Sequence, residues 1–478
     1  MLHLSFSEII NKYPSPEKDN NRSTITSLLE KLKIKIVVLD DDPTGIQTVH
    51  GCLLLTKWDD KNLTLALKDP VPFFYILTNS RSMDPETAKK ITKDVVHAVI
   101  HVNREFQFRL IFISRSDSTL RGHFPLEPET IRDTILSNNI ALPLPVFFIP
   151  AFLEAGRYTI DNIQYLRDND KLIPVAETEF ARDNVFGYSS SNLMDYIIEK
   201  SKNKINKNQV GAISITDIRR NAIGDIIKII RTQKDKEYII INALDYGDLR
   251  KFALSFLKLF THLDSSAVLR TSSSLPRALS GIGDKALLSG EDVIKKEGPG
   301  LFIVGSHVKK TTLQLQSLLK HPEVQGIEMD VNEILTRPEM LIDKTIQLLN
   351  QLLSQNITPA VYTSRKELRL ESPSDRLLTG KKTSSFLVDI VRNLPFTPAY
   401  IVAKGGITSH DILTNGLNIK YARVMGQILA GVPVIMTDEK DKFPHMPVII
   451  FPGNVGNEDS LNEVFKKLNL TNASSFLF

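Results

Sequence analysis

Short apolar runs rich in β-branched residues recur along the chain, and each ends in polar or glycine-containing residues before a longer segment with helical periodicity. Runs that are apolar throughout are typical of strands buried on both faces of a parallel sheet. We therefore predict an α/β protein with two doubly wound, mainly parallel-sheet domains and a ligand cleft between them. The expected strands are 34–39, 73–77, 110–113, 146–149, 212–215 and 238–241 in the first domain, and 301–304, 359–362, 399–403, 432–436 and 448–451 in the second.

The two series of expected strands are separated by a polar, glycine-containing stretch at residues 280–300. A length of 478 residues exceeds that of one typical domain. The Gly-Pro-Gly sequence at 298–300 also favours a break in regular structure. We place the boundary near residue 290, which gives an N-terminal domain of residues 1–290 and a C-terminal domain of residues 291–478.

The charge balance and cysteine content narrow the class of protein. The chain has 59 Lys and Arg residues against 55 Asp and Glu, and a net charge of +4 is not the strong positive field of a non-specific nucleic-acid binder. The single cysteine, Cys52, excludes an intramolecular disulfide and a zinc site with more than one thiolate. The first residues lack a signal-peptide pattern, and no segment approaches the roughly 20 apolar residues of a membrane span. We expect a globular cytoplasmic protein that binds neither nucleic acid nor membranes.

Acidic residues follow the first expected strand, where Asp40, Asp41 and Asp42 precede Thr44 and Gly45. In open α/β sheets, ligands bind beyond the carboxyl ends of the strands. Three adjacent carboxylates repel one another, and a cation, a proton or a hydrogen-bonding ligand relieves that repulsion. Asp41 and Asp42 are therefore candidates to bind a substrate hydroxyl or a hydrated magnesium ion. The alternative is a solvated turn in which an aspartate caps a helix.

Arginines follow the next three expected strands: Arg81, then Arg115 and Arg121, then Arg157. A guanidinium group suits the planar, bidentate recognition of a carboxylate or a phosphate. If these loops share one edge of the sheet, the arginines indicate a small acidic substrate. Each arginine taken alone is also compatible with a surface position or with a nearby acidic partner.

Glycines mark the strand ends of the second domain, at Gly305, at Gly405 and Gly406, and at Gly453. A glycine turn that opens a helix exposes unpaired N–H groups, which bind phosphate without net protein charge. Thr408 or Ser409 is expected to cap the following helix or to donate to a phosphate oxygen.

Two tempting motifs are rejected. Residues 379–383 read TGKKT, but a P-loop requires a glycine where Asp375 stands, and no apolar strand precedes the segment. We expect a basic loop there. His307, His410 and His445 are scattered and lack metal-ligand spacing.

Taken together, the sequence resembles the four-carbon acid sugar kinase family over most of its length. The resemblance rests on the order and spacing of DDPTG at 41–45, SDSTLRG at 116–122, PAFLEAGR at 150–157, GS at 305–306, GGITS at 405–409, GVP at 431–433 and PGNVG at 452–456. Two positions depart from the pattern. Many members carry an acidic residue where Ile407 stands, and smaller or apolar residues where Lys404 stands.

The resemblance implies an ATP-dependent kinase that phosphorylates the terminal hydroxyl of threonate, erythronate or a 3-oxo-tetronate to the 4-phosphate. We expect ATP and Mg²⁺ as its cofactors. It implies a sugar-acid-binding N-terminal domain and a nucleotide-binding C-terminal domain. The expected catalytic residues are Asp42 and Asp117, and the expected substrate-binding residues are Asp41, Arg81, Arg115, Arg121 and Arg157. The expected nucleotide-binding residues are Ser306, Lys404, Gly405, Gly406, Ile407, Thr408, Gly453 and Asn454.

Phosphoryl transfer depends chiefly on positioning the two substrates and neutralising charge on the transferred group. We hypothesise that Arg115 and Arg121 hold the substrate carboxylate and that Asp42 or Asp117 is the general base. A magnesium ion and the amides of the glycine loops bind the ATP phosphates in this scheme, and domain closure excludes water. The magnesium ligands, the sugar acid and its stereoisomer stay open, and both a monomer and a homo-oligomer are compatible with the sequence.

Two other functions compete with the kinase. Asp40, Asp42 and Thr44 fit the DxDxT motif of a haloacid-dehalogenase-like phosphatase, in which an aspartate is phosphorylated. A phosphatase of this kind needs a later strand that ends in an acidic metal-binding pair. Gly283 and Asp284 follow no apolar run, so they do not fit this requirement. The phosphatase hypothesis also gives the glycine loops of the second domain no role. The second alternative is a non-catalytic small-molecule sensor with the same two lobes.

Overall fold

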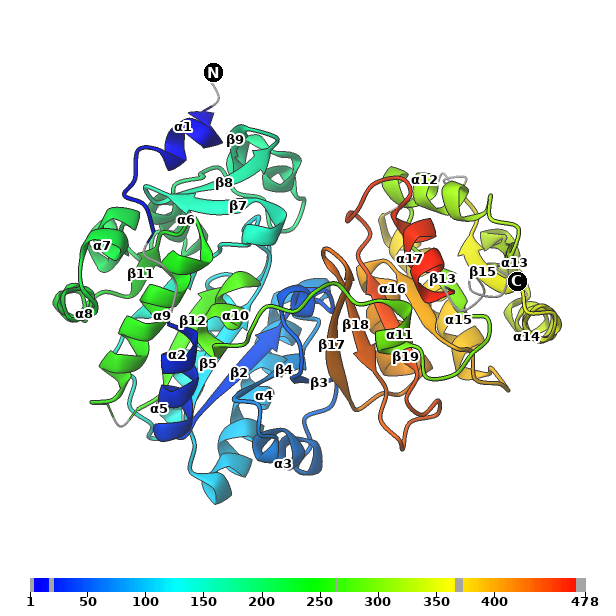
Figure 1. The fold of residues 1–478 in the computed structure, drawn as a ribbon, viewed down its shortest axis with the longest axis horizontal. Coiled ribbons are helices and arrows are strands. Elements are labelled where there is room, and N and C mark those ends of the chain that lie inside the picture. The colour runs from blue at the N-terminus through cyan, green and yellow to red at the C-terminus, as the bar shows by residue number, and fades with distance from the viewer. Residues whose placement is uncertain (1–3, 17–20, 264, 366–372, 470–478) are drawn as a thin grey trace, which may run out of the picture. The chain divides into compact units, whose positions relative to one another are not determined.

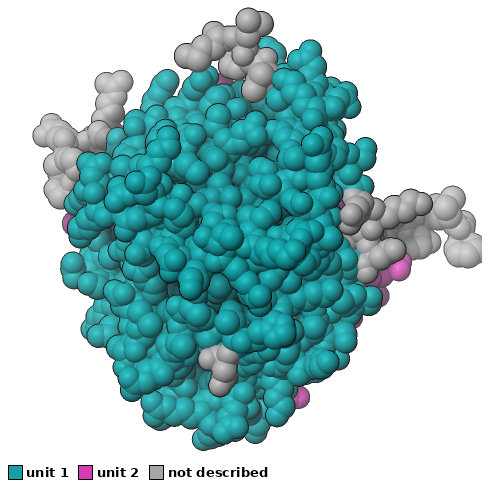
Figure 2. All heavy atoms as spheres, turned by 90° about the vertical axis from the view of Figure 1, so that its left-hand side faces the viewer, with its two compact units in different colours: residues 1–284 teal, residues 285–478 magenta. Residues whose placement is uncertain are grey.

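The computed structural model describes residues 4–16, 21–263, 265–365 and 373–469 (Figure 1). The chain divides into two compact units, Met1–Asp284 and Lys285–Phe478, which Figure 2 colours separately. The expected boundary was residue 290. Each unit is an α/β structure, and the predicted α/β class with mainly parallel strands is confirmed.

The main sheet of unit 1 is parallel throughout, in the order β10-β11-β6-β12-β5-β2-β4-β3. Every residue of its strand β2 is buried, as expected for a strand covered on both faces. The strands are β2 (Ile34–Asp40), β3 (Leu53–Leu55), β4 (Phe73–Leu77), β5 (Arg109–Arg115), β6 (Val146–Ile149), β10 (Val210–Ile213), β11 (Tyr238–Ile241) and β12 (Ala267–Thr271).

Helices cover this sheet in two groups. In the first group, α3 and α5 each pack against α4. In the second group, α9 is central and contacts α2, α7, α8 and α10. Their bounds are α2 (Arg22–Lys31), α3 (Asp60–Lys68), α4 (Pro85–Phe106), α5 (Leu126–Ser137), α6 (Leu193–Lys200), α7 (Ile215–Arg220), α8 (Ile223–Thr232), α9 (Tyr246–Phe260) and α10 (Ser274–Ser280).

A small antiparallel sheet, β1-β9-β8-β7, lies within unit 1 and was not predicted (Figure 1). Its strands are β1 (Leu4–Ser5), β7 (Arg157–Ile160), β8 (Ile163–Asp168) and β9 (Lys171–Pro174), and the short helix α1 (Phe6–Ile10) follows β1. Phe6, Tyr158 and Tyr165 contribute to a separate hydrophobic core beside it.

The expected strands of unit 1 coincide with observed strands, except that 212–215 ends too late. Strand β10 stops at Ile213 because Ser214 caps α7, and Ser214 and Asp217 form a reciprocal capping box. Strands β3 and β12 were not predicted. Strand β12 was missed because its apolar run is short and Arg270 interrupts it.

The sheet of unit 2 has the order β17-β18-β19-β16-β13-β15-β14. Strands β19, β16, β13, β15 and β14 are parallel, whereas β17-β18 and β18-β19 are antiparallel pairs. The strands are β13 (Leu301–Val304), β14 (Val324–Met329), β15 (Thr358–Thr363), β16 (Ile401–Lys404), β17 (Tyr421–Leu429), β18 (Val432–Met436) and β19 (Pro447–Phe451). The run 432–436 is therefore a strand, as expected, but in an antiparallel hairpin.

The helices of unit 2 are α11 (Gly290–Val293), α12 (Lys309–Leu318), α13 (Val331–Thr336), α14 (Pro338–Ser354), α15 (Pro373–Arg392), α16 (Gly406–Asp411) and α17 (Ser460–Leu468). A π-helical turn, η7 (Ile412–Gly416), continues α16. The basic loop expected at 379–383 is wrong, because these residues lie inside α15. Asp375 also lies in α15, but its side chain is outside the described residues. Among the described helices, none is long and apolar enough to cross a membrane.

The end of strand β2 packs against the 3-10 helix η1 (Gly45–Thr48) through a glycine. A Cβ atom at Gly45 would lie 1.9 Å from Oδ2 of Asp40, closer than any real contact. Asp40 is fully buried, so its carboxylate cannot move aside into solvent. Gly45 is therefore required by close packing.

We predict that Gly45→Ala lowers the free energy of unfolding by about 1–3 kcal/mol through overpacking. The matched control is Gly224→Ala in α8, where an added Cβ meets no atom within 4 Å. That control should be neutral or slightly stabilising, because alanine favours helix more than glycine does. Urea unfolding of both variants measures the difference, and equal midpoints would contradict this account of Gly45.

Candidate active site

The carboxyl ends of β4, β2, β5, β12 and β6 lie next to one another in unit 1. All these strands are parallel, so the loops after them meet at one edge of the sheet. The four loops chosen from the sequence therefore share that edge, and the unpredicted strand β12 adds a fifth.

Asp40, the last residue of β2, is buried and pairs with Arg115, the last residue of β5. Arg115 Nη1 donates to Asp40 Oδ1 at 3.0 Å. Burial raises the pKa of Asp40 to about 7, although the positive charge of Arg115 opposes that rise. Within the described chain, Asp40 Oδ2 accepts no hydrogen bond. The pair joins the ends of two neighbouring strands beneath the surface.

This burial bears on the phosphatase alternative. An aspartate that is phosphorylated must reach the phosphorus atom of its substrate. Asp40 is 0% exposed and its carboxylate is enclosed by Gly45 and Arg115. Asp284 pairs with Arg22 and Arg277. Neither residue is placed as that chemistry requires.

Asp41 is also buried, and it fixes Arg81. Arg81 Nε donates to Asp41 Oδ2 at 3.0 Å, and its Nη2 donates to the other carboxylate oxygen. The Ser116 hydroxyl donates to the same carboxylate. The Asp41 carboxylate therefore joins its own loop to the loops after β4 and β5.

Asp42 is the member of the acidic run that reaches solvent, with 22% of its side chain exposed. Its Oδ1 accepts from the backbone N–H of Thr44 at 2.8 Å and from the Thr44 hydroxyl. Arg81 Nη1 lies 3.4 Å from Oδ2. Burial alone would raise the pKa of Asp42, but Arg81, Arg115 and Thr44 together lower it below its usual value. Asp42 is thus an accessible, ionised carboxylate.

Asp117 and Arg121 form a second, partly exposed ion pair after β5. Arg121 Nε donates to Asp117 Oδ2 at 2.6 Å, and the Thr119 hydroxyl donates to the same oxygen at 2.5 Å. Burial acts to raise the pKa of Asp117, but Arg81 and Arg121 outweigh it and lower the pKa. The Arg121 guanidinium carbon lies 4.8 Å from the Phe180 ring centroid.

The four predicted arginines differ in what they can reach. Arg115 is only 5% exposed and also donates to Ser273 Oγ at 3.0 Å, whereas Arg81 and Arg121 are 20% and 26% exposed. Arg157 donates to the Ala155 carbonyl, and its Nε has no hydrogen-bond partner among the described residues. Burial lowers the pKa of Arg157. The negative charge of Asp117 acts to raise this pKa, and the positive charge of Arg121 acts to lower it further.

Sequence reasoning missed several residues at this edge. Strand β12 brings Arg270 and Ser273, and Arg270 Nη1 lies 3.3 Å from the buried carboxylate of Glu127. Asp183 approaches Arg121 at 3.8 Å. The short apolar run at the start of β12, residues 267–269, was the available sequence signal for the strand. Phe180 and Asp183 do not directly follow a strand, so the strand-end argument did not identify them.

In unit 2 the neighbouring parallel strands β13, β16 and β19 bring the glycine loops to one edge. A Cβ atom on Gly305 would lie 2.2 Å from Thr408 Oγ1, so Thr408 packs directly on that glycine. Gly405 has φ +118°, a conformation that favours glycine. The loops form a closely packed edge made largely of backbone.

Lys404 lies beneath these loops rather than on their surface. It is buried, and its Nζ donates to the carbonyls of Pro452 at 2.6 Å and Gly453 at 3.4 Å. Burial, with a smaller effect from Lys310, lowers the pKa of Lys404 to about 7. Lys404 therefore ties β16 to the loop after β19.

The other residues predicted to bind nucleotide lie around the same edge. The Thr311 hydroxyl lies 3.2 Å from Ser306 Oγ and 3.1 Å from the Gly453 carbonyl oxygen. Ile407 is 64% exposed, which is unusual for an apolar side chain. Asn454 is exposed, and its backbone carbonyl accepts a hydrogen bond from Lys310 Nζ at 3.2 Å.

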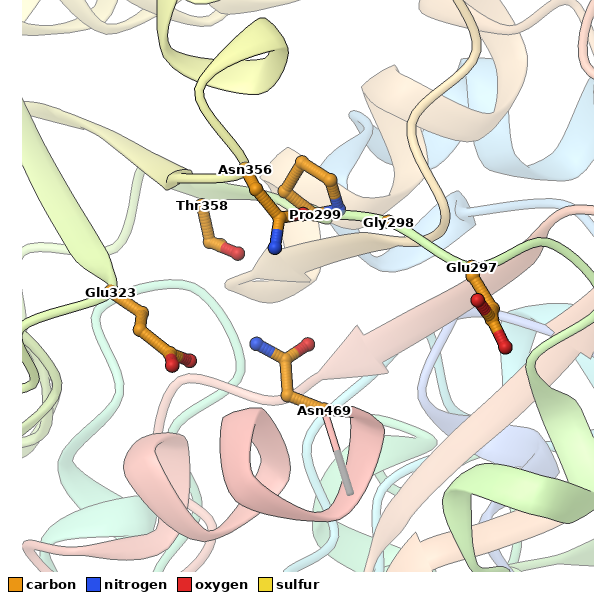
Figure 3. A pocket seen from close by; sticks show the side chains of 7 residues that line it. All are labelled: Glu297, Gly298, Pro299, Glu323, Asn356, Thr358 and Asn469. Carbon is orange, nitrogen blue, oxygen red and sulfur yellow. The ribbon is translucent and has the colours of Figure 1, made fainter. Parts of the chain in front are cut away.

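A cavity of about 260 Å³ lies at the opposite ends of the unit 2 strands (Figure 3). Thr358 begins β15 there, and the amides of Asn356 and Asn469 point toward one another across the opening (Figure 3). Because the cavity lies at the amino ends of these strands, it is separate from the glycine loops.

Comparisons with known proteins cover both units. Residues 36–279 match the family model described as a sugar-binding N-terminal domain, and residues 301–461 match the nucleotide-binding C-terminal domain. The chain is similar to D-erythronate kinase of Heliobacterium modesticaldum, with 23% identity over 89% of this chain and 95% of that protein.

Two solved structures have the same fold. A Haemophilus influenzae protein of the DUF1537 family has 16% identity and a TM-score of 0.63, over 90% of this chain and all of its own. A Salmonella typhimurium LT2 protein has 15% identity and a TM-score of 0.65, over 90% of this chain and 98% of its own. With both domain models matched in order along the chain, the resemblance seen in the sequence is confirmed, and the protein belongs to the four-carbon acid sugar kinase family.

Proposed function

We propose that this protein transfers the γ-phosphoryl group of ATP to the terminal hydroxyl of a four-carbon sugar acid and forms the 4-phosphate. The observation that carries the proposal is the grouping of partly exposed, ionised carboxylates with guanidinium groups at one edge of the unit 1 sheet. The similarity to D-erythronate kinase supports the substrate class. It makes D-erythronate the first acid to assay, followed by threonate and the 3-oxo-tetronates.

We assign the substrate carboxylate to Arg121 and Arg157. Arg121 is partly exposed, and Arg157 donates a hydrogen bond to the backbone carbonyl of Ala155. An anion beside Arg157 would offset the burial that lowers its pKa. Arg115, the carboxylate contact expected from the sequence, is buried against Asp40, and we give it a positioning role instead.

We assign Asp42 as the general base. One oxygen of Asp117 already accepts from both Arg121 and Thr119, and only 14% of the Asp117 side chain is exposed. Asp42 is more exposed, and its Oδ2 has a long contact of 3.4 Å with Arg81 Nη1. In the reaction, the substrate hydroxyl oxygen bonds to the γ-phosphorus as the bond to the ADP oxygen breaks, and Asp42 accepts the hydroxyl proton. The loose transition state of phosphoryl transfer makes positioning of the hydroxyl more important than a strongly basic group.

We assign the ATP phosphates to the glycine loops of unit 2. Ser306, Gly405, Gly406, Thr408, Gly453 and Asn454 lie at or beside the carboxyl ends of β13, β16 and β19. Closely packed glycine turns let a phosphate approach backbone N–H groups directly. The exposed Ile407 offers an apolar contact at the same loop.

Magnesium fits this arrangement as the partner of the phosphates. Within the described ranges, no group of three or more His, Cys, Asp or Glu side chains is placed to hold a metal ion. Mg²⁺ in phosphoryl-transfer enzymes keeps several waters and is bound by substrate phosphates with one or two carboxylates. The ion neutralises charge on the phosphates, and the protein orients the hydroxyl.

The first test is a coupled ADP-release screen of C4 sugar acids, their 3-oxo forms, shorter and longer acids, and a neutral C4 polyol. We expect a clear preference for a C4 acid, and Arg157→Met should raise its KM about 10- to 100-fold by removing a charge-assisted contact. Arg104→Met, at an exposed position on α4, is the control and should leave KM unchanged. Preference for the neutral polyol would overturn the proposed carboxylate site.

The second test concerns the base. Asp42→Asn should lower kcat about 10²- to 10⁴-fold, the usual effect of losing a general base, while KM for ATP stays unchanged. Asp94→Asn, exposed on α4, is the matched control. Because the pKa of Asp42 is lowered, the wild-type enzyme should keep this carboxylate active at pH 5 and lose it only below pH 3.8. Wild-type turnover by Asp42→Asn would exclude it as the base.

The third test concerns Lys404. Lys404→Met removes the contacts with Pro452 and Gly453 and should weaken ATP binding about tenfold in calorimetric titration. Lys466→Met, at an exposed position on α17, is the control and should leave ATP binding unchanged.

The buried Lys404 amine also predicts that the free energy of unfolding of the wild-type protein rises between pH 7 and 10.5. The folded state binds fewer protons at Lys404 there than the unfolded state does. Urea unfolding should show a smaller rise for Lys404→Met, and an identical pH dependence would contradict the buried, perturbed amine.

A further inference from the structure

Three side chains donate hydrogen bonds to three successive carbonyls of the loop that carries Asp117 and Arg121. Gln164 Nε2 donates to the Ser118 carbonyl at 2.9 Å. The Tyr188 hydroxyl donates to the Thr119 carbonyl, and the Tyr196 hydroxyl to the Leu120 carbonyl, each at 2.7 Å. All three donors come from residues 164–196, which are distant in sequence from the loop. We call these three residues the brace.

The braced loop has an unusual backbone. Leu120 has φ +66°, in the left-handed region that a residue with a branched side chain rarely adopts, and Gly122 has φ +127°. Such a conformation persists only where the surrounding structure fixes it. The brace contacts the carbonyls at and just before Leu120, so it acts where the loop is least favoured on its own.

Gln164 also links this loop to the neighbouring one. Its Nε2 donates to the Pro150 carbonyl at 3.1 Å, and its Oε1 accepts from the Thr159 hydroxyl at 2.7 Å. Gln164 and Thr159 are both fully buried. The loop after β5 and the loop after β6 are therefore held at a fixed spacing by one amide group, and these loops lead to Arg121 and Arg157.

We propose that Gln164, Tyr188 and Tyr196 are positioning residues, which set the distance and orientation of Asp117 and Arg121 relative to Arg157 for binding the sugar acid. The proposal rests on the proposed function, because it assumes that these charged groups contact the substrate. The brace itself touches no reacting atom. Burial raises the pKa of both tyrosines above the usual value, so both hydroxyls stay protonated and remain donors at the pH of an assay.

The structure supplies a matched control for removing a buried tyrosine hydroxyl. Tyr238 is 1% exposed, and its hydroxyl has no hydrogen-bond partner among the described residues. The rings of Tyr196 and Tyr238 each lie 5.4 Å from the ring of Phe124. Tyr238→Phe thus makes the same chemical change, in the same aromatic cluster, without touching the loop.

The experiment compares Tyr188→Phe, Tyr196→Phe, their double variant and Gln164→Met with Tyr238→Phe. We expect amide hydrogen exchange across residues 116–122 to become about three- to tenfold faster for each brace variant, as for the loss of one hydrogen bond. KM for the preferred sugar acid should rise by a similar factor and further in the double variant, whereas KM for ATP should not change. Tyr238→Phe should match the wild type in all three measurements.

The outcomes separate the two proposals. Unchanged exchange in the brace variants overturns the brace, even if the protein is an active kinase. Faster exchange with an unchanged KM for the sugar acid overturns the positioning role. A wild-type protein that phosphorylates no sugar acid overturns the proposed function and the positioning role with it, while the exchange data still decide whether the three donors hold the loop.

Discussion

The buried ion pair between Asp40 and Arg115 is the constraint on which the candidate site depends. It lies between the last residues of two neighbouring strands, which are partners in the sheet register. Removing one member of a buried pair leaves an uncompensated charge, which costs about 3–5 kcal/mol. Asp42 and Asp117, each two residues beyond a member of this pair, are the partly exposed carboxylates of their loops. The partly exposed carboxylates of the candidate site therefore lie directly beyond a buried ion pair.

In the proposed function, the two units accommodate anions by different means. Unit 1 relies on guanidinium groups fixed by carboxylates, so each arginine keeps a defined direction. Unit 2 relies on glycine turns, and the buried Lys404 supports the loops from below. This division explains how a chain with a net charge of only +4 is compatible with two acidic ligands. The positive groups are local and are largely paired within the protein.

The strand ends of both sheets were predictable because continuous apolar runs have few alternatives to burial in a covered sheet. Strand β12 was not predicted because Arg270 places a charge in the interior, where the carboxylate of Glu127 and the hydroxyl of Ser114 accept its hydrogen bonds. Strand β17 was not predicted because its buried residues alternate with partly exposed ones. This pattern is a weaker sequence signal for a strand than a continuous apolar run. The roles of individual arginines were beyond prediction. Arg115 and Arg121 both follow the same expected strand in the sequence, and only the fold makes one buried and the other accessible.

The place of β12 in the sheet bears on how the protein is made. This strand lies between β5 and β6, yet it is the last strand of unit 1 in the chain. A nascent chain that has not yet released residue 271 from the ribosome lacks the strand that joins its two half-sheets. The edge that carries Asp42, Arg121 and Arg157 therefore cannot close until nearly all of unit 1 has been synthesised. Contacts between residues so far apart in sequence form slowly. Until then the edges of the earlier strands that β12 will pair with are exposed, and unpaired strand edges favour aggregation.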